Sequence, residues 1–495
     1  MRSQNPFLLV LLVVGLLGLL SLLKPGLTVG GVELRPVRLL ADILRKDPAA
    51  VARLAAPPPN GPATVAPADT VAAAAAVPDS AAAAPAGDTK PRLPAVPNLG
   101  GLDSFLAALR QTKADGSPVR IAYFGDSMIE GDLITGDLRN SLQTEFGGTG
   151  VGYVPINSIT ADFRNTIRQT FSPDWYEYNL VSDKLPAKCP LGISGHAFLA
   201  RESSSRDSTG IVADTSWVQF QGTRRFATTQ RFAQARLFYG PGSARDQVLV
   251  TTDRHRVPHA MPGSGAVNEL LLNPGVPART MRLAFAVHGP RPVYGVSFES
   301  PQGVVLDNFS FRGNSGLALT KIPFGQLAAF GQRLDYRLII LHYGVNVASA
   351  SYASYNWYER GMTRVVDRMQ RAFPNASILI VGMSDKSSRI DGEFQTDPSV
   401  PRLLAAQRRL AQRNHAAFWN LYEAMGGENS MVSWVENSPA LANKDYTHVN
   451  GRGAHKIAGL LFGYLMQQYA QPTPADAART DSTVRPARDS ATVSR

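Results

Sequence analysis

The sequence predicts an α/β protein: a three-layer α/β/α domain with a mainly parallel sheet, interrupted by an inserted β-sandwich and preceded by a transmembrane helix. Three observations predict this organisation. Apolar runs of strand length alternate with segments of helical periodicity in two separate parts of the chain. Between these parts, residues 201–300 contain short apolar segments separated by Gly- and Pro-bearing turns. Near the N-terminus, residues 7–23 are apolar without interruption.

The N-terminal apolar run reads FLLVLLVVGLLGLLSLL and is flanked by Arg2 and Lys24. Its 17 residues reach the lower limit for spanning a bilayer. No small-x-small cleavage site follows in the sequence. We therefore expect residues 1–30 to form a cytoplasmic tip and an uncleaved transmembrane anchor, and a cleaved signal peptide is the alternative.

Residues 31–98 are predicted to be a juxtamembrane segment followed by a linker. From Ala55 onward the composition is dominated by Ala, Pro, Thr and Asp. Such a segment cannot bury enough apolar surface to fold, and its prolines keep it extended. The tail at 472–495 is similarly polar, and we expect it to be disordered.

The first part of the α/β domain, residues 99–200, contains a strand pattern at Val119 to Phe124 that stops at Gly125. A helix is predicted next, with Ile134, Leu138 and Leu142 on one face and Asp132 and Asp137 near its positive end. Asp126 and Ser127 occupy the junction. Open α/β sheets place ligands at this position, and the first helical turn offers unpaired N–H groups. A simple helix cap is the alternative role.

A second motif with catalytic residue types lies near the C-terminus, where Asp445 precedes His448 by three residues. A histidine that takes a proton from a serine needs a carboxylate to fix its tautomer and orientation. One short loop supplies both groups here. Ser127, His448 and Asp445 therefore form a plausible catalytic triad, although neither motif is specific alone.

The second part of the α/β domain, residues 301–471, resumes the alternation of strands and helices. Strand patterns occur at 338–341 and 378–381, and Met362, Val366 and Met369 have helical spacing between them. Asn346 follows the first of these strands. In a parallel sheet it should lie on the same edge as Ser127.

Three segments resemble conserved blocks one, three and five of the SGNH, or GDSL-like, hydrolase family: GDSMIEGD (125–132), YGVNVAS (343–349) and DYTH (445–448). The longer stretch at 125–153 is similar to the branch that contains bacterial peptidoglycan O-acetylesterases and related envelope acyl-esterases. The resemblance implies a flavodoxin-like domain. It also implies that Ser127 is the nucleophile, His448 the base and Asp445 its orienting group.

In this family the oxyanion hole is formed by the nucleophile's N–H, a block-two glycine N–H and the block-three Asn side chain. The resemblance assigns Ser127 and Asn346 to it. For the glycine we prefer Gly316 in FRGNSGLAL, because it precedes the block-three strand, and Gly195 in LGISGHAF is the alternative. Asn346 is followed by Val347 where the family often has Asp, which argues against a close lipase or thioesterase relative.

The predicted β-sandwich at 201–300 interrupts the hydrolase domain. Several envelope esterases of this branch carry a carbohydrate-binding-like sandwich in a comparable place, so the resemblance implies a role in presenting a glycan. From the sequence alone, a purely structural insertion is equally compatible.

Charge and cysteine content exclude several other classes. The formal net charge is +11, but the Arg residues are scattered and no aromatic-interleaved basic stripe occurs, so we do not expect nucleic-acid binding. Cys189 is the single cysteine and cannot form an intramolecular disulfide, a metal site or a redox pair. His255 and His259 lack carboxylate partners at ligand-like spacing. We expect neither a metal nor an organic cofactor.

The sequence therefore predicts a serine esterase that removes O-acyl groups, with acetyl expected, from a cell-envelope polysaccharide such as peptidoglycan. Its expected location is the inner (cytoplasmic) membrane, as a single-pass protein with an extracytoplasmic, periplasmic catalytic domain. Two alternatives stay open. An O-acetyltransferase would use the same triad together with a membrane acyl-donor protein, and a non-catalytic glycan-binding scaffold would need no triad.

Overall fold

The computed structural model describes residues 28–29, 32–33, 101–202, 216–253, 255–273 and 276–471. In the N-terminal unit, β1 (Thr28–Val29) pairs with β2 (Val32–Glu33) in antiparallel orientation. The predicted anchor at 7–23 and tail at 472–495 lie outside the described residues. Within the described residues, no helix is long and apolar enough to cross a membrane.

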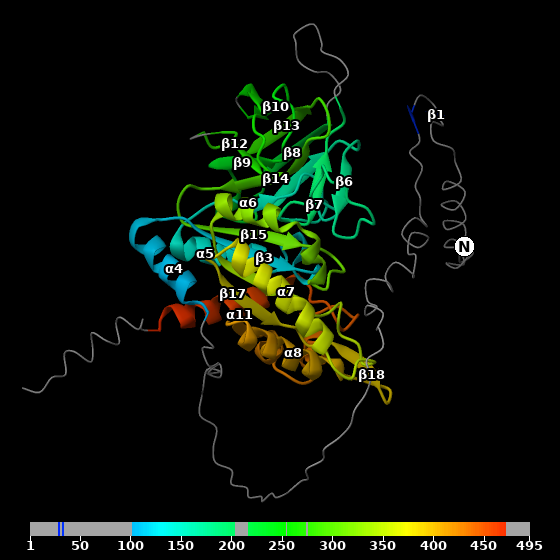
Figure 1. Cartoon of the computed structure of the whole chain (residues 1–495). Coiled ribbons are helices and arrows are strands. Elements are labelled where there is room, and N and C mark those ends of the chain that lie inside the picture. Colours follow the sequence, from blue (N-terminus) through cyan, green and yellow to red (C-terminus); the bar gives the residue numbers. More distant parts are fainter. Residues whose placement is uncertain are drawn as a thin grey trace, which may run out of the picture. The chain divides into compact units, whose positions relative to one another are not determined.

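A five-stranded parallel sheet forms the centre of the α/β domain, as the sequence predicts (Figure 1). Its strand order is β15-β3-β16-β17-β20. The bounds are Val119–Gly125 for β3, Val304–Ser310 for β15, Tyr336–His342 for β16, Ser377–Gly382 for β17 and Ala417–Asn420 for β20. Later strands lie on both sides of β3, so the strand order reverses there. Ligands bind at such reversal points in open α/β sheets.

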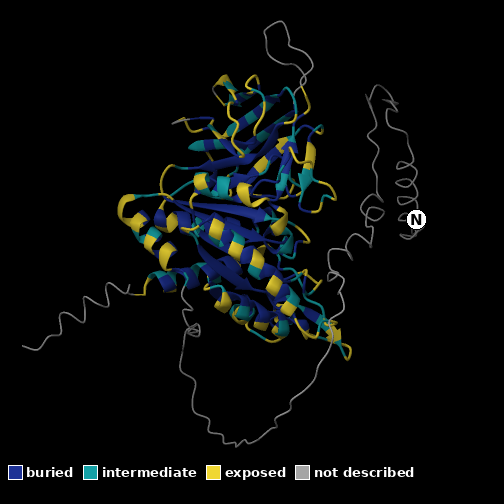
Figure 2. Cartoon of the chain, in the orientation of Figure 1, coloured by how far each residue is buried: buried dark blue, intermediate teal, exposed yellow. Residues whose placement is uncertain are grey.

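Helices cover both faces of this sheet and give three layers. Side chains alternate along β3: Ala122 and Phe124 pack with helices α6, α7 and α8, whereas Ile121 and Tyr123 pack with α4, α5 and α11. The helices are α4 (Asp103–Asp115), α5 (Thr135–Phe146), α6 (Phe324–Leu334), α7 (Asn356–Ala372), α8 (Ser399–Arg413), α9 (Leu421–Met425), α10 (Ser430–Glu436) and α11 (Gly451–Tyr469). Short 3-10 turns are η1 (Ser127–Asp132), η2 (Ala227–Thr229) and η3 (Leu317–Lys321). Figure 2 shows the buried sheet between helices whose outer faces are exposed.

The inserted domain is a β-sandwich of two antiparallel sheets. One has the order β11-β10-β13-β8-β5, and the other β12-β9-β14-β7-β6 with β4 beside β14. The strands are β4 (Gly152–Val154), β5 (Ile167–Phe171), β6 (Tyr176–Asn179), β7 (His196–Leu199), β8 (Ser216–Gly222), β9 (Gln234–Tyr239), β10 (Gln247–Thr252), β11 (Arg256–Ala260), β12 (Asn268–Leu271), β13 (Thr280–Ala286) and β14 (Pro292–Glu299). Apolar side chains from both sheets form a separate core.

The sandwich begins at β4, so the predicted boundary at residue 201 was wrong. Strand β5 pairs with β8, and β7 pairs with β14. These partners lie much later in the chain, and local periodicity carries no information about which strands will pair. The segment between 152 and 199 therefore belongs to the insertion and not to the first part of the α/β domain.

Asp132 joins the 3-10 turn η1 to the insertion. Its carboxylate accepts hydrogen bonds from Arg139 of α5 (3.1 Å), Arg164 of the sandwich segment (3.0 Å), Thr135 (2.9 Å) and Asn308 of β15 (2.9 Å). Burial alone would raise the pKa of Asp132, but the two guanidinium groups outweigh it and hold the pKa well below its usual range. The carboxylate therefore stays ionised and binds the two domains together.

Candidate active site

Ser127 lies immediately beyond the carboxyl end of β3. That strand ends at Gly125, where an added Cβ would lie 2.9 Å from the Ile129 side chain and 3.0 Å from the His342 carbonyl oxygen, so only glycine fits. Asp126 then accepts a hydrogen bond from the Met128 N–H (3.0 Å). Ser127 begins the 3-10 turn η1, and the regular helix starts only at Thr135. The turn η1 therefore separates the serine from the predicted helix. Ser127 is the first residue of this turn, so its N–H makes no hydrogen bond within the turn.

The structure brings together the three side chains that the sequence suggested as a triad. Ser127 Oγ lies 3.0 Å from His448 Nε2, and His448 Nδ1 lies 2.8 Å from Asp445 Oδ2. Ser127 follows the end of β3, and the other two come from the loop before α11. This order of carboxylate, imidazole and hydroxyl is the arrangement that activates a serine.

Backbone hydrogen bonds fix Asp445 for this contact. Its Oδ1 accepts from the N–H groups of His448 (2.9 Å) and Thr447 (3.0 Å), which leaves Oδ2 for the imidazole. Partial burial raises the pKa of Asp445, but these hydrogen bonds outweigh it and the pKa falls below its usual value. The carboxylate is therefore ionised at neutral pH.

Tyr446, between the two catalytic candidates, has a left-handed backbone with φ of 54°. Its carbonyl accepts a hydrogen bond from Ser387 N–H (2.9 Å), at the start of the hairpin formed by β18 (Ser387–Ile390) and β19 (Glu393–Thr396). Its ring stacks on Phe394 of β19, with 3.7 Å between ring centroids and 10° between planes. The Arg389 guanidinium lies 5.2 Å from the Phe394 ring. The hairpin thus supports the turn that carries Asp445 and His448.

Asn346 lies in the loop after β16 and faces the same site. Its Nδ2 donates to Asp126 Oδ2 (3.1 Å) and to the Asn314 carbonyl (3.3 Å). Asp126 is buried, and this burial raises its pKa to about 7. Sequence reasoning considered Asp126 only as a cap, whereas the structure shows that it also orients the Asn346 amide.

Neither of the two glycines suggested for the oxyanion hole lines the cavity at Ser127. Gly316 N–H donates to Asn314 Oδ1 (2.9 Å), and an added Cβ would lie 2.8 Å from Met362 Sδ, so this glycine serves close packing. Gly195 lies against Leu180 of the insertion. Gly313 instead borders the cavity at Ser127, and no described residue accepts a hydrogen bond from its N–H. Its place just beyond the end of β15 was the available signal, because parallel strands end at the same edge of a sheet.

The cavity at Ser127 has a volume of about 410 Å³. Its wall is formed by Ser127, Met128, Glu130, Leu133, Arg312, Gly313, Asn346, Asn443, Asp445, His448 and Val449. An opening of this size admits an ester group together with part of the molecule that carries it. Seven of these eleven residues have polar or charged side chains, which can hydrogen-bond to a hydroxyl-bearing substrate.

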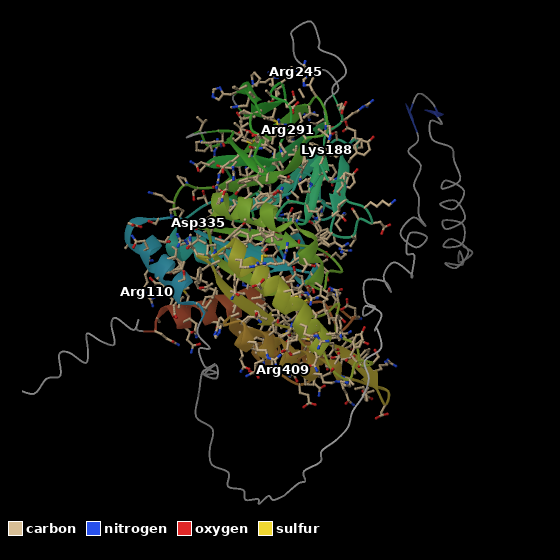
Figure 3. All side chains as sticks on the ribbon, viewed as in Figure 1. Arg110, Lys188, Arg245, Arg291, Asp335 and Arg409 are labelled. Carbon is tan, nitrogen blue, oxygen red and sulfur yellow. The ribbon has the colours of Figure 1, made fainter. Side chains whose placement is uncertain are left out.

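Other candidate chemistries find less support among the described residues. No group of three or more His, Cys, Asp or Glu side chains there is arranged to hold a metal ion. Burial raises the pKa of Cys189 to about 11, so its thiol stays protonated at neutral pH. Figure 3 shows the cations Arg110, Lys188, Arg245 and Arg409 in separate places on the two domains.

A comparison with solved structures identifies the fold. The structure described as "Peptidoglycan O-acetylesterase in action, 5 min" matches with a TM-score of 0.61 and 20% sequence identity, over 75% of this chain and 98% of that one. The chain has the fold of that peptidoglycan O-acetylesterase. This confirms the fold that the resemblance to SGNH, or GDSL-like, hydrolases predicts. At 20% identity the likeness establishes the fold and leaves the activity to be argued from the site.

Two further matches have low TM-scores and carry no argument. An acetyl xylan esterase gives a TM-score of 0.24 at 16% identity, over 33% of this chain and 81% of that one. A putative GDSL-like lipase from Parabacteroides merdae gives 0.26 at 16% identity, over 32% and 72%. A scan against protein-family models and a search of curated proteins both give no match.

Proposed function

We propose that the protein is a membrane-anchored serine esterase that removes O-acetyl groups from a cell-envelope polysaccharide such as peptidoglycan. The observation that carries this proposal is the continuous chain of contacts from Asp445 through His448 to Ser127, at the strand-order reversal of the parallel sheet. The fold shared with a peptidoglycan O-acetylesterase supports the choice of substrate class.

In the proposed reaction, His448 Nε2 takes the proton of Ser127 Oγ as this oxygen attacks the ester carbonyl carbon. Asp445 holds the imidazole in position and stabilises its protonated form. His448 then gives the proton to the departing sugar oxygen, which leaves an acetyl group on Ser127. Water, deprotonated by His448, attacks this acetyl-serine, and acetate leaves as the proton returns to Ser127 Oγ.

We assign the oxyanion hole to the N–H groups of Ser127 and Gly313 and the amide of Asn346. We prefer Gly313 to the predicted Gly316 because Gly313 and Asn346 both line the cavity at Ser127, and Gly316 does not. Gly313 has a φ of 75°, a left-handed conformation that glycine adopts without strain. No atom lies within 4 Å of an added Cβ, so the backbone conformation and not the lack of space favours glycine here. Each donor should stabilise the transition state by about 3 kcal/mol.

Acetate release by the purified full chain tests the proposal. The substrates are O-acetylated peptidoglycan and a small acetyl ester, and the key variant is Ser127→Ala. We expect the parent to release acetate from both substrates and the variant to lose at least a thousandfold in kcat. Ser104→Ala is a matched control, because Ser104 is exposed on α4 and should leave both rates unchanged.

Equal rates in the parent and Ser127→Ala would exclude a serine mechanism. A folded parent that is inactive toward both substrates would exclude hydrolysis. Assays with an added glycan acceptor would then distinguish acetyl transfer from binding without catalysis.

We further propose that residues 7–23 anchor the protein in the inner membrane and that the catalytic domain is extracytoplasmic. The uninterrupted apolar run and the Ala/Pro-rich segment after it support this location. The intact mass of protein extracted from membranes should equal that of the uncleaved chain, 53.3 kDa. A mass that lacks the N-terminal segment would instead identify a cleaved signal peptide.

A further inference from the structure

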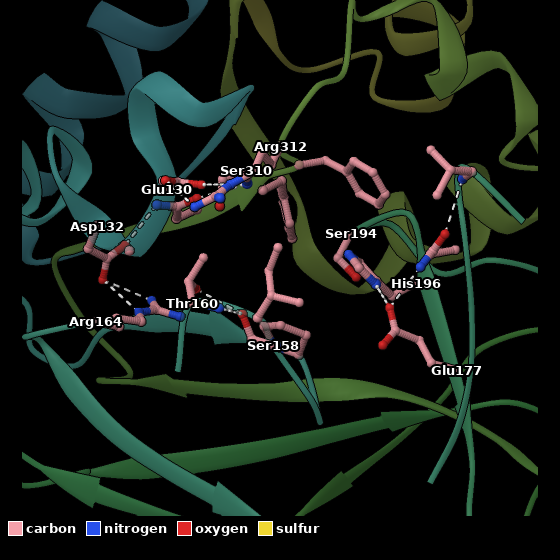
Figure 4. A pocket seen from close by; sticks show the side chains of 18 residues that line it. Glu130, Asp132, Ser158, Thr160, Arg164, Glu177, Ser194, His196, Ser310 and Arg312 are labelled. Atoms are coloured by element: carbon pink, nitrogen blue, oxygen red, sulfur yellow. Dashed lines mark hydrogen bonds and ion pairs between the residues drawn. The ribbon is translucent and has the colours of Figure 1, made fainter. Parts of the chain in front are cut away.

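A second cavity, of about 310 Å³, lies where η1 and the end of β15 meet the sandwich (Figure 4). Glu130 and Arg312 border both this cavity and the one at Ser127. Arg312 donates to the two carboxylate oxygens of Glu130 at 2.8 and 2.7 Å. The two cavities therefore adjoin along this ion pair.

One part of the second cavity is apolar and accessible to solvent. Ile159 is 75% exposed and Val181 is 50% exposed. Phe311, half-buried, lies against the His196 ring at 5.2 Å between centroids. Exposed apolar side chains gathered at a cavity are typical of a binding surface.

The other part presents polar groups from β6 and β7. Glu177 Oε1 lies 2.8 Å from His196 Nδ1 and accepts from Asn179 Nδ2 at 2.9 Å. Burial opposes ionisation of Glu177, but the His196 hydrogen bond outweighs it and lowers the pKa of the carboxyl. Both contacts use Oε1, so Oε2 of an ionised carboxylate stays available to a ligand. Figure 4 shows Glu177 and His196 across the cavity from Glu130 and Arg312.

We propose that this cavity is a second sugar subsite, which binds a neutral pyranose residue of the same polysaccharide next to the sugar whose acetyl group lies at Ser127. The inference rests on the proposed esterase function. A pyranose offers both hydroxyl groups for Glu177 and Asn179 and a C–H face for Ile159 and Phe311, so it matches the two parts of the wall. Its attachment to the acetylated sugar explains why the cavities adjoin.

A long acyl chain is a poorer match for this cavity. It would remove water from Glu177, Asn179 and Arg312 without replacing the lost hydrogen bonds, which carries a substantial cost for each polar group. A sugar replaces those hydrogen bonds. The insertion thus takes part in substrate recognition through β6 and β7, while the parallel sheet carries the reacting groups.

The test compares substrates that reach the second cavity with substrates that do not. The measured quantity is the ratio of kcat/KM for O-acetylated peptidoglycan to kcat/KM for a small acetyl ester. In the double variant Glu177→Gln/Ile159→Ala of the full chain we expect this ratio to fall about tenfold. The matched control Glu436→Gln/Val257→Ala changes exposed residues on α10 and β11 and should leave the ratio unchanged.

Sedimentation with insoluble peptidoglycan supplies a readout that needs no turnover. In the Ser127→Ala background, the double variant should bind the polymer several-fold more weakly than Ser127→Ala alone. An unchanged ratio together with unchanged binding would overturn the subsite. A selective loss of activity toward an octanoyl ester relative to an acetyl ester would also overturn it, because the cavity would then hold an acyl chain.

The two proposals can fail separately. If the parent has no activity toward any ester, the proposed function is wrong. The sedimentation experiment still decides whether the cavity binds the polymer. If the parent is active but the double variant changes neither the polymer preference nor the polymer binding, only the subsite proposal is wrong.

Discussion

The stack of Phe394 on Tyr446 should contribute to catalysis, although neither ring contacts the reacting atoms. The left-handed backbone of Tyr446 sets the turn between Asp445 and His448. This conformation costs a non-glycine residue about 1–2 kcal/mol. The stacked ring and the hydrogen bond from Ser387 offset that cost. We therefore predict that Phe394→Ala lowers the activity.

The magnitude follows from the geometry of the pair. The centroid distance of 3.7 Å and the angle of 10° indicate close parallel contact. Because face-to-face rings gain less from their quadrupoles than offset or edge-to-face pairs, the stabilisation comes mainly from the apolar area that the Phe394 ring removes from water, about 1 kcal/mol for a partly buried ring. If this contribution no longer stabilises the turn between Asp445 and His448, kcat/KM should decrease two- to tenfold.

The assay is hydrolysis of a small acetyl ester, which does not depend on polymer binding. Phe394→Tyr should retain activity, because it keeps the stacked ring. Phe324→Ala is the matched control. Phe324 is also partly exposed, and the Arg371 guanidinium lies 4.9 Å from its ring. Unlike Phe394, it lies on α6, away from the turn that carries Asp445 and His448. Thermal unfolding of each variant separates a local effect from general destabilisation.

Unchanged kcat/KM in Phe394→Ala would refute the reasoning. Equal losses in Phe394→Ala and Phe324→Ala would also refute it, because the effect would then be unrelated to the catalytic turn.

Three further predictions follow from the site. Asn346→Ala should lower kcat 10²- to 10³-fold through loss of an oxyanion donor, and steady-state kinetics showing less than a threefold change would remove Asn346 from the hole. Asp132→Asn should lower the free energy of unfolding in urea by about 3–5 kcal/mol at pH 7, because two buried guanidinium groups lose their counter-charge; a loss below about 1 kcal/mol would contradict this. The raised pKa of Asp126 means that the folded state disfavours the ionised carboxylate. The free energy of unfolding should therefore fall as the pH rises from the unfolded-state pKa near 4 to the folded-state pKa of about 7. The slope is at most about 1.4 kcal/mol per pH unit. Asp126→Asn should remove this slope in unfolding experiments between pH 4 and 7, and parallel pH profiles of parent and variant would contradict the assignment.

The catalytic candidates illustrate what could be predicted locally. Ser127 follows an apolar strand pattern and a glycine, and Asp445 and His448 lie three residues apart, so each motif is visible within a few residues. The sheet also follows from local patterns, because buried strands and amphipathic helices have different periods. Distances of 3.0 and 2.8 Å along the triad agree with the convergence that these motifs suggested.

The partners of these residues required the tertiary structure. Gly313 and Gly316 are only three residues apart, but Gly313 lines the cavity at Ser127 and the Gly316 N–H bonds to the Asn314 side chain. The contact between Asp126 and Asn346 joins two strand ends that are far apart in the chain.

The sequence by itself determined the α/β class, the presence of a β-rich insertion and the three residues of the candidate triad, because period, composition and short-range spacing are local properties. Only the tertiary structure decided where the insertion begins, which glycine borders the cavity at Ser127 and which hairpin supports Tyr446. Those features depend on pairing and packing between distant segments, and a single sequence does not state which distant segments meet.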